Sequence, residues 1–138
     1  MTANTRHQQS SRLLDFVRQF NKHIYNPIML RFVRFIPIYA VIEHVGRRSG
    51  KQYRTPVLVG RVADGFYIPL PYGDHVDWHR NVQAASGFTL TWRGRKYAMR
   101  YGRMVDEVEA ITHMPRLAHR GLRRAHVKSY IKVFDASA

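Results

Sequence analysis

An alternation of apolar and polar residues with a period of two runs through the centre of this sequence and restricts what the chain can fold into. Such alternation is typical of half-buried strands, and short turns interrupt it at Asp64-Gly65 and Arg93-Gly94. Asp64-Gly65 is a strong hairpin signal because both residues tolerate a positive φ. The expected strands cover residues 39–45, 53–62, 66–70, 88–92, 95–103 and, with weaker alternation, 127–134.

Helical spacing of apolar residues appears before these strands and at two places between them. Helices are expected over 12–25 and 28–35, over 77–85, and from Asp106 onward with a break near Pro115. Five or six antiparallel strands with one inserted helix predict a small β-barrel, because a closed barrel leaves no exposed strand edges. We expect one domain over residues 1–138, with a helical segment at 1–37 and the barrel at 38–134.

The charge of the chain is unusual. Lysine and arginine number 23 against 9 aspartates and glutamates, which gives a net charge of +14. This predicts attraction to nucleic acid, to anionic lipid, or to a ligand with phosphates or several carboxylates, and composition does not choose among them. The absence of cysteine excludes disulfides and thiolate metal sites. No apolar run reaches the roughly 18 residues of a membrane span, and no signal peptide is evident, so a cytoplasmic location is expected.

A basic, glycine-bounded segment separates the first two expected strands. It is Gly46-Arg47-Arg48-Ser49-Gly50-Lys51, and Arg54-Thr55-Pro56 follows just beyond it. The glycines let the backbone bend, the serine adds a hydroxyl, and the four basic residues supply cations. The segment suits a phosphate or carboxylate, although its spacing is not that of a Walker loop. The alternative is a solvated basic hairpin turn.

A second group of residues surrounds the inserted helix. Trp78 and Asn81 are three positions apart and so share a helical face. A tryptophan wall with an amide donor suits a planar, hydrogen-bonding ring, whereas the alternative is a core tryptophan with an asparagine at the surface or in a cap. His75 and His79 are spaced i, i+4, but no third metal ligand is evident, and we expect no metal.

Taken together, these segments resemble the deazaflavin-dependent nitroreductase family. The resemblance rests on the run from Ala40 to Lys51, on Arg54-Thr55-Pro56-Val57, on the Asp64-Gly65 hairpin and on Trp78-x-x-Asn81, and it covers about residues 26–105. It implies a split β-barrel of the FMN-binding type that binds the deazaflavin coenzyme F420. Family members transfer a hydride from the reduced coenzyme to quinones, nitro-compounds or unsaturated ketones, and the cofactor itself carries that chemistry.

By position in these motifs, the resemblance implies a set of cofactor-binding residues, while catalytic residues stay unknown. The set is Arg47, Arg48, Ser49, Lys51, Arg54, Thr55, Pro56, Tyr72, Gly73, Trp78 and Asn81. The sequence departs from the family at Pro71-Tyr72-Gly73-Asp74, where well-studied members have a Ser-Lys-Gly-Gly-like stretch. The same fold could instead hold FMN, haem or a lipid. A nucleic-acid-binding domain is a second alternative, but neither a helix-turn-helix nor a repeated basic-aromatic surface is evident.

Two other basic stretches have open interpretations. The N-terminal helical segment could pack on the barrel, act as a lid, or make a peripheral membrane contact. The run from His113 to His126 carries four arginines and is either a solvated face or a surface for a polyanion or membrane. The expected partners are the coenzyme and a small-molecule acceptor, with the protein as a monomer or homodimer.

Overall fold

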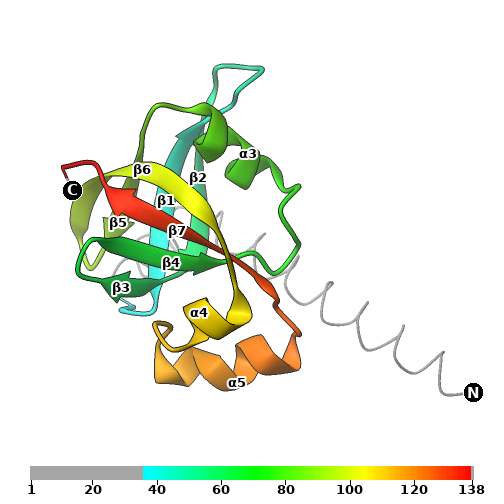
Figure 1. The fold of residues 1–138 in the computed structure, drawn as a ribbon. Helices are drawn as coiled ribbons and strands as arrows, with labels where there is room; N and C mark the ends of the chain where they lie inside the picture. The colour runs from blue at the N-terminus through cyan, green and yellow to red at the C-terminus, as the bar shows by residue number, and fades with distance from the viewer. Residues whose placement is uncertain (1–35, 138) are drawn as a thin grey trace, which may run out of the picture.

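A computed structural model describes residues 36–137, which form seven strands and three short helices (Figure 1). The expected helices over 12–25 and 28–35 lie outside the described residues. None of the helices in the described part is long and apolar enough to cross a membrane. The elements, in chain order, are β1 (Tyr39–Val45), β2 (Gln52–Leu58), β3 (Gly60–Val62), β4 (Gly65–Pro69), α3 (Asp77–Ala84), β5 (Phe88–Trp92), β6 (Arg95–Asp106), α4 (Glu107–Ile111), α5 (Arg116–Arg124) and β7 (Ser129–Asp135).

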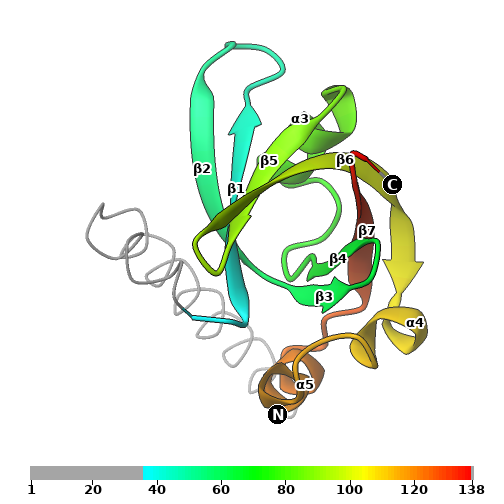
Figure 2. The ribbon, with the colours of Figure 1, turned by 90° about the vertical axis from the view of Figure 1, so that its left-hand side faces the viewer.

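The strands form one antiparallel sheet that curls into a barrel. Their order in the sheet is β2-β1-β5-β6-β7-β4-β3, so β2 and β3 are its two edges. Only Val59 separates these two edges along the chain, which places the ends of β2 and β3 within about 7 Å of each other. Figure 2 shows the strands arranged around a common centre. The predicted fold class, a mainly β barrel with a short helix inserted between strands, is confirmed.

The barrel buries two apolar clusters, one on each face of its sheet. Alternate residues of the strands point inward and form the first cluster, and Val82 of α3 closes one end of it. The intervening residues of β4, β6 and β7 point outward and are covered by α4 and α5. The inner cluster comprises Ala40, Ile42, Val57, Val59, Phe66, Ile68, Leu70, Val82, Phe88, Leu90, Met99, Ile131 and Val133. The outer cluster comprises Tyr67, Val105, Ala110, Met114, Ala118, Leu122, Val127 and Tyr130.

Seven strands are present where five or six are expected, because the expected strand 53–62 is two strands. The chain bends at Val59 and Gly60 to pass from one edge of the sheet to the other. Gly60 permits the passage, since a Cβ at this position would overlap the backbone carbonyl of His113. The last strand also begins later than predicted, at Ser129. The Val127 N–H is used at the end of α5, where it donates to the carbonyl of Leu122 (3.1 Å) and His126 adopts a positive φ of 53°.

The two predicted hairpins are both present, but the reason given for the first is wrong. Its two-residue loop is Ala63-Asp64, Val62 pairs with Gly65, and neither Asp64 nor Gly65 has a positive φ. Gly65 is instead needed as the first residue of β4, because a Cβ there would overlap the carbonyl of Val133 on β7. The second loop does use positive φ, at Arg93 (51°) and Gly94 (76°).

Strand β6 runs to Asp106, three residues beyond the predicted end. Its pairing with β7 continues past an irregularity between Tyr101 and Arg103, where Gly102 is an extra residue. A Cβ on Gly102 would overlap the carbonyl of Lys132, so the bulge requires glycine. Asp106 then caps α4 by accepting a hydrogen bond from the Glu109 N–H (2.9 Å), which agrees with the predicted helix start.

Candidate functional site

The basic segment between β1 and β2 forms a tight loop whose backbone is bonded to itself. The Gly46 N–H donates to the carbonyl of Lys51 (2.8 Å), and the Gly50 N–H donates to the carbonyl of Gly46 (2.9 Å). Gly50 has a φ of +69°, which a residue with a side chain would adopt only with strain. The Lys51 N–H also donates to the hydroxyl of Ser49 (3.2 Å). The loop therefore has one defined shape, and its basic side chains project from it.

Arg47 fastens this loop to helix α3. Its backbone N–H donates to Oδ1 of Asn81 (3.1 Å), and its guanidinium donates to the same oxygen (2.9 Å). The guanidinium also lies 3.4 Å from a carboxylate oxygen of Asp77, one helical turn earlier. The side chain of Arg47 is only 23% exposed as a result. Arg47 thus acts as the anchor of the loop.

Asn81 extends the connection into the barrel wall. Because its oxygen accepts two bonds from Arg47, its amide nitrogen must face Nδ1 of His44 (3.1 Å) and donate to it. His44 Nδ1 is therefore the acceptor, and Nε2 carries the proton that it donates to the Thr55 hydroxyl (2.9 Å). Burial lowers the pKa of His44, which agrees with this neutral ring. The ring also stacks on Tyr53, with centroids 5.6 Å apart.

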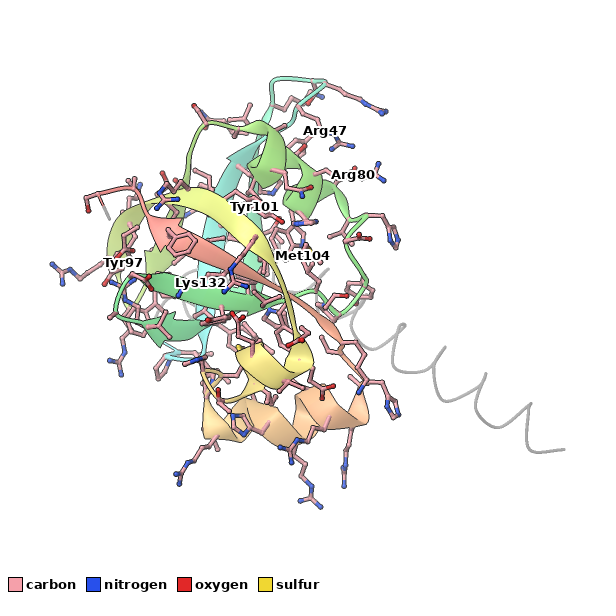
Figure 3. The ribbon with its side chains drawn as sticks, in the orientation of Figure 1. Arg47, Arg80, Tyr97, Tyr101, Met104 and Lys132 are labelled. Atoms are coloured by element: carbon pink, nitrogen blue, oxygen red, sulfur yellow. The ribbon has the colours of Figure 1, made fainter. Side chains whose placement is uncertain are left out.

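The remaining cations of this corner have few carboxylate partners. Within residues 36–137, Arg48, Lys51 and Arg80 form no ion pair. Arg54, whose side chain is half-exposed, lies 3.5 Å from a carboxylate oxygen of Glu43. Arg80 belongs to α3, as do the partners of Arg47, and Figure 3 shows these two arginines at the same corner of the molecule. The corner therefore presents a positive surface on a fixed frame.

The other predicted site residues lie in three different settings. Pro56 is half-buried on β2 opposite Val41 of β1. Tyr72 and Gly73 form the turn between β4 and α3, where Gly73 has a φ of +89°. Trp78 is partly buried and packs against the inner cluster. Of the predicted set, Arg47, Thr55 and Asn81 are joined through His44 by one chain of hydrogen bonds.

His79 is a second buried histidine, 1% exposed, and its hydrogen bonds are internal. Nδ1 donates to the carbonyl of Asp74 (2.6 Å), and Nε2 pairs with the Tyr101 hydroxyl (3.0 Å). The same hydroxyl accepts a hydrogen bond from the side-chain amide of Gln83 (3.2 Å). Burial raises the pKa of Tyr101. No group of three or more potential metal ligands occurs among residues 36–137. This network fixes α3 to β6.

Two residues of the corner, His44 and Arg80, are absent from the predicted set. His44 had a usable signal, since the period-two pattern places it on the same face of β1 as Ala40 and Ile42, which belong to the inner cluster. A histidine on a buried face needs hydrogen-bond partners, and here they are Asn81 and Thr55. Arg80 carried no signal beyond its charge.

Comparison with known proteins establishes only the fold. No protein-family model matches the sequence, and no curated protein is significantly similar to it. One solved structure, described as a domain-swapped dimer, is similar at 12% sequence identity with a TM-score of 0.50, covering 88% of this chain and 98% of that chain. The chain has a known fold. A structure described as F420-H2 dependent reductase (FDR-A) is similar at 14% identity with a TM-score of 0.47, covering 69% of this chain and 93% of that chain.

Proposed function

We propose that this protein binds the deazaflavin coenzyme F420 on the loop corner and transfers a hydride from the reduced coenzyme to a small organic acceptor. The acceptor would be a quinone, a nitro-compound or an enone. One observation carries the proposal. The loop between β1 and β2 is held to α3 by Arg47, while Arg48 and Lys51 next to that anchor have no ion-pair partner in residues 36–137.

The chemistry of this corner fits the coenzyme tail, which carries a phosphodiester and several carboxylates. Arg48, Lys51 and Arg80 are separate cations on three positions, and each can donate charge-assisted hydrogen bonds to a different anionic group. The Ser49 hydroxyl adds a neutral donor beside them. FMN has a single phosphate and would engage fewer of these cations. The donor set therefore favours the deazaflavin coenzyme over FMN.

The rigid frame of the loop also favours tight binding. A mobile basic loop would lose conformational entropy when it closed on an anion, and that loss would reduce the affinity. Here the bonds from Arg47 to Asn81 and the internal bonds of the loop are already made. We assign Arg48, Lys51, Arg54 and Arg80 to tail binding, and Arg47 and Asn81 to positioning. Trp78 then remains the candidate wall for the ring system.

The bound coenzyme supplies the hydride, and the protein needs only to hold donor and acceptor in register and to limit water. Hydride transfer therefore requires no protein nucleophile. Its test is oxidation of the reduced coenzyme, followed by absorbance, with one quinone, one nitro-compound and one enone as acceptors.

We expect saturable, acceptor-dependent oxidation with at least one acceptor class. The variant Arg48→Gln/Lys51→Gln should raise the coenzyme KM, and the matched variant Arg95→Gln/Arg100→Gln, with the same loss of charge on β6, should not. Tight coenzyme binding without turnover of any acceptor would refute the reductase assignment. Equal effects of the two double variants would refute the assignment of the loop.

A further inference from the structure

Helix α5 presents a row of arginines to solvent, on the side of the helix opposite to the face that packs on the barrel. The helix buries Ala118 and Leu122 in the outer cluster. Arg116, Arg120 and Arg124 are spaced four residues apart, so they form one stripe along the exposed side, about 12 Å long. Arg123 lies beside this stripe and is also exposed. Together these four residues form the arginine face.

Nothing in the described part of the chain neutralises this face. None of its four arginines forms an ion pair within residues 36–137, and α5 contains no acidic residue. The two carboxylates of neighbouring α4 are bound elsewhere, Glu107 to Lys128 (2.6 Å) and Glu109 to Arg103 (2.8 Å). Like charges four residues apart destabilise a helix. Arg123 and Arg124 offset part of this cost at the helix C-terminus, but Arg116 and Arg120 do not.

The same two helices carry the most exposed large apolar side chains in residues 36–137. Leu117 of α5 is 87% exposed and Val108 of α4 is 81% exposed, whereas the next in rank, Val45, is 48% exposed. Leu117 directly follows the first arginine of the face. Figure 1 shows α4 and α5 next to each other at one end of the barrel, remote from the β1–β2 loop. A leucine this exposed contributes no free energy of apolar burial to the fold.

We propose that the arginine face, with Leu117, binds the surface of a membrane that contains anionic lipid. Guanidinium groups pair with lipid phosphates, and an adjacent leucine can enter the boundary between headgroups and acyl chains. Nucleic acid shares the phosphate chemistry, but a phosphate backbone offers no apolar layer for Leu117. The arginine face itself carries no aromatic side chain on which bases could stack, and the one ring of the helix, His119, is half-buried and bonds to the carbonyl of Met114 (2.8 Å).

The test is co-sedimentation of the full-length protein with vesicles at low salt. One set of vesicles is pure phosphatidylcholine, and the other contains phosphatidylglycerol as well. We expect binding to the anionic vesicles only. Each arginine near the surface changes the partition coefficient about fivefold, so Arg116→Gln/Arg120→Gln should weaken binding about 25-fold. Leu117→Ser should weaken it further without changing the charge.

The control is Arg95→Gln/Arg100→Gln, which removes the same charge from β6. Its binding to anionic vesicles should stay within about twofold of the wild type, since the proposal assigns the contact to α5 and not to the overall field. Equal losses in the two double variants would overturn the proposal, and so would a Leu117→Ser variant that binds like the wild type. Tighter binding to a DNA duplex than to the vesicles, lost in Arg116→Gln/Arg120→Gln, would replace it by a nucleic-acid surface.

Discussion

Substitution of Asn81 tests whether this residue stabilises the fold by holding Arg47 and His44 in place. Asn81 is 5% exposed, accepts two hydrogen bonds from Arg47 and donates one to His44. In Asn81→Ala, water can replace the bond to the Arg47 guanidinium, but Nδ1 of His44, in a residue that is 6% exposed, loses its donor. A buried polar group left without a partner costs about 1–3 kcal/mol, and each lost bond about 0.5–1.5 kcal/mol. We expect a total loss of about 2–4 kcal/mol in the free energy of unfolding.

The assay is urea unfolding, with Gln83→Ala as the matched control on the same helix. Gln83 is exposed and makes one amide hydrogen bond, to Tyr101, so its removal should cost about 1 kcal/mol or less. The variant Asn81→Asp adds a test of the tautomer. Its second oxygen would face Nδ1 of His44, so Nδ1 would have to carry a proton, either because the ring takes one up or because the tautomer changes and Nε2 accepts from the Thr55 hydroxyl. In both cases the adjacent carboxylate favours the protonated ring.

The pKa of His44 should therefore be raised in Asn81→Asp, whereas burial lowers it in the wild type. NMR titration of the His44 ring protons measures both. In the wild type the lowered pKa means that the unfolded chain binds more protons, so stability should fall as the pH drops below the ordinary imidazole value of about 6.5. The reasoning is refuted if Asn81→Ala costs no more than Gln83→Ala and if the pKa of His44 stays low in Asn81→Asp.

Three further predictions concern the basic loop, the passage from β2 to β3 at Gly60, and the loss of stability at acid pH. Lys51→Ala should weaken coenzyme binding by about 1.5–3 kcal/mol in a fluorescence titration and leave the unfolding midpoint unchanged, since the side chain is solvated. Gly60→Ala should destabilise the fold by about 1–3 kcal/mol because its Cβ would overlap the His113 carbonyl. Gly121→Ala has open space around it on α5 and should stabilise the fold by about 0.5–1 kcal/mol. Denaturant unfolding that gives the two variants the same stability would contradict this. Hydrogen bonds from Arg103, and then from Tyr67, hold the pKa of Glu109 below its usual range. The stability that this carboxylate contributes is therefore present above the ordinary carboxyl pKa and is lost as the pH falls. Glu109→Gln should flatten this part of a curve of unfolding free energy against pH.

The local pattern located most strands and both hairpins, but not the division of 53–62 into β2 and β3 or the close contacts between strands. Alternation found β1 and β5, and Arg93-Gly94 marked a turn with positive φ. Gly60, Gly65 and Gly102 looked like ordinary turn or strand residues, although each is needed because a backbone carbonyl from a distant segment lies against it. Such requirements come from tertiary packing, which one strand's sequence does not encode.

The same limit applies to the candidate site. The basic loop could be recognised because its residues are contiguous, and Asn81 was selected through its spacing from Trp78. The bonds that connect them join residues 34 and 37 positions apart, from Arg47 and His44 to Asn81. Only the fold brings these residues together. The bonds of Asn81 to Arg47 and His44 were therefore not predicted, and its role toward a cofactor stays a prediction.

We propose that the fixed cationic loop recognises the anionic tail of coenzyme F420. The most direct measurement is a fluorescence titration of the purified protein with the coenzyme, with a truncated coenzyme that lacks the glutamate tail, and with FMN, each at low and high salt. We expect the tightest binding for the full coenzyme, a loss of affinity on truncation, and a steeper salt dependence for the full tail than for FMN. Equal affinities for the full and truncated coenzymes, unchanged in Arg48→Gln/Lys51→Gln, would contradict it.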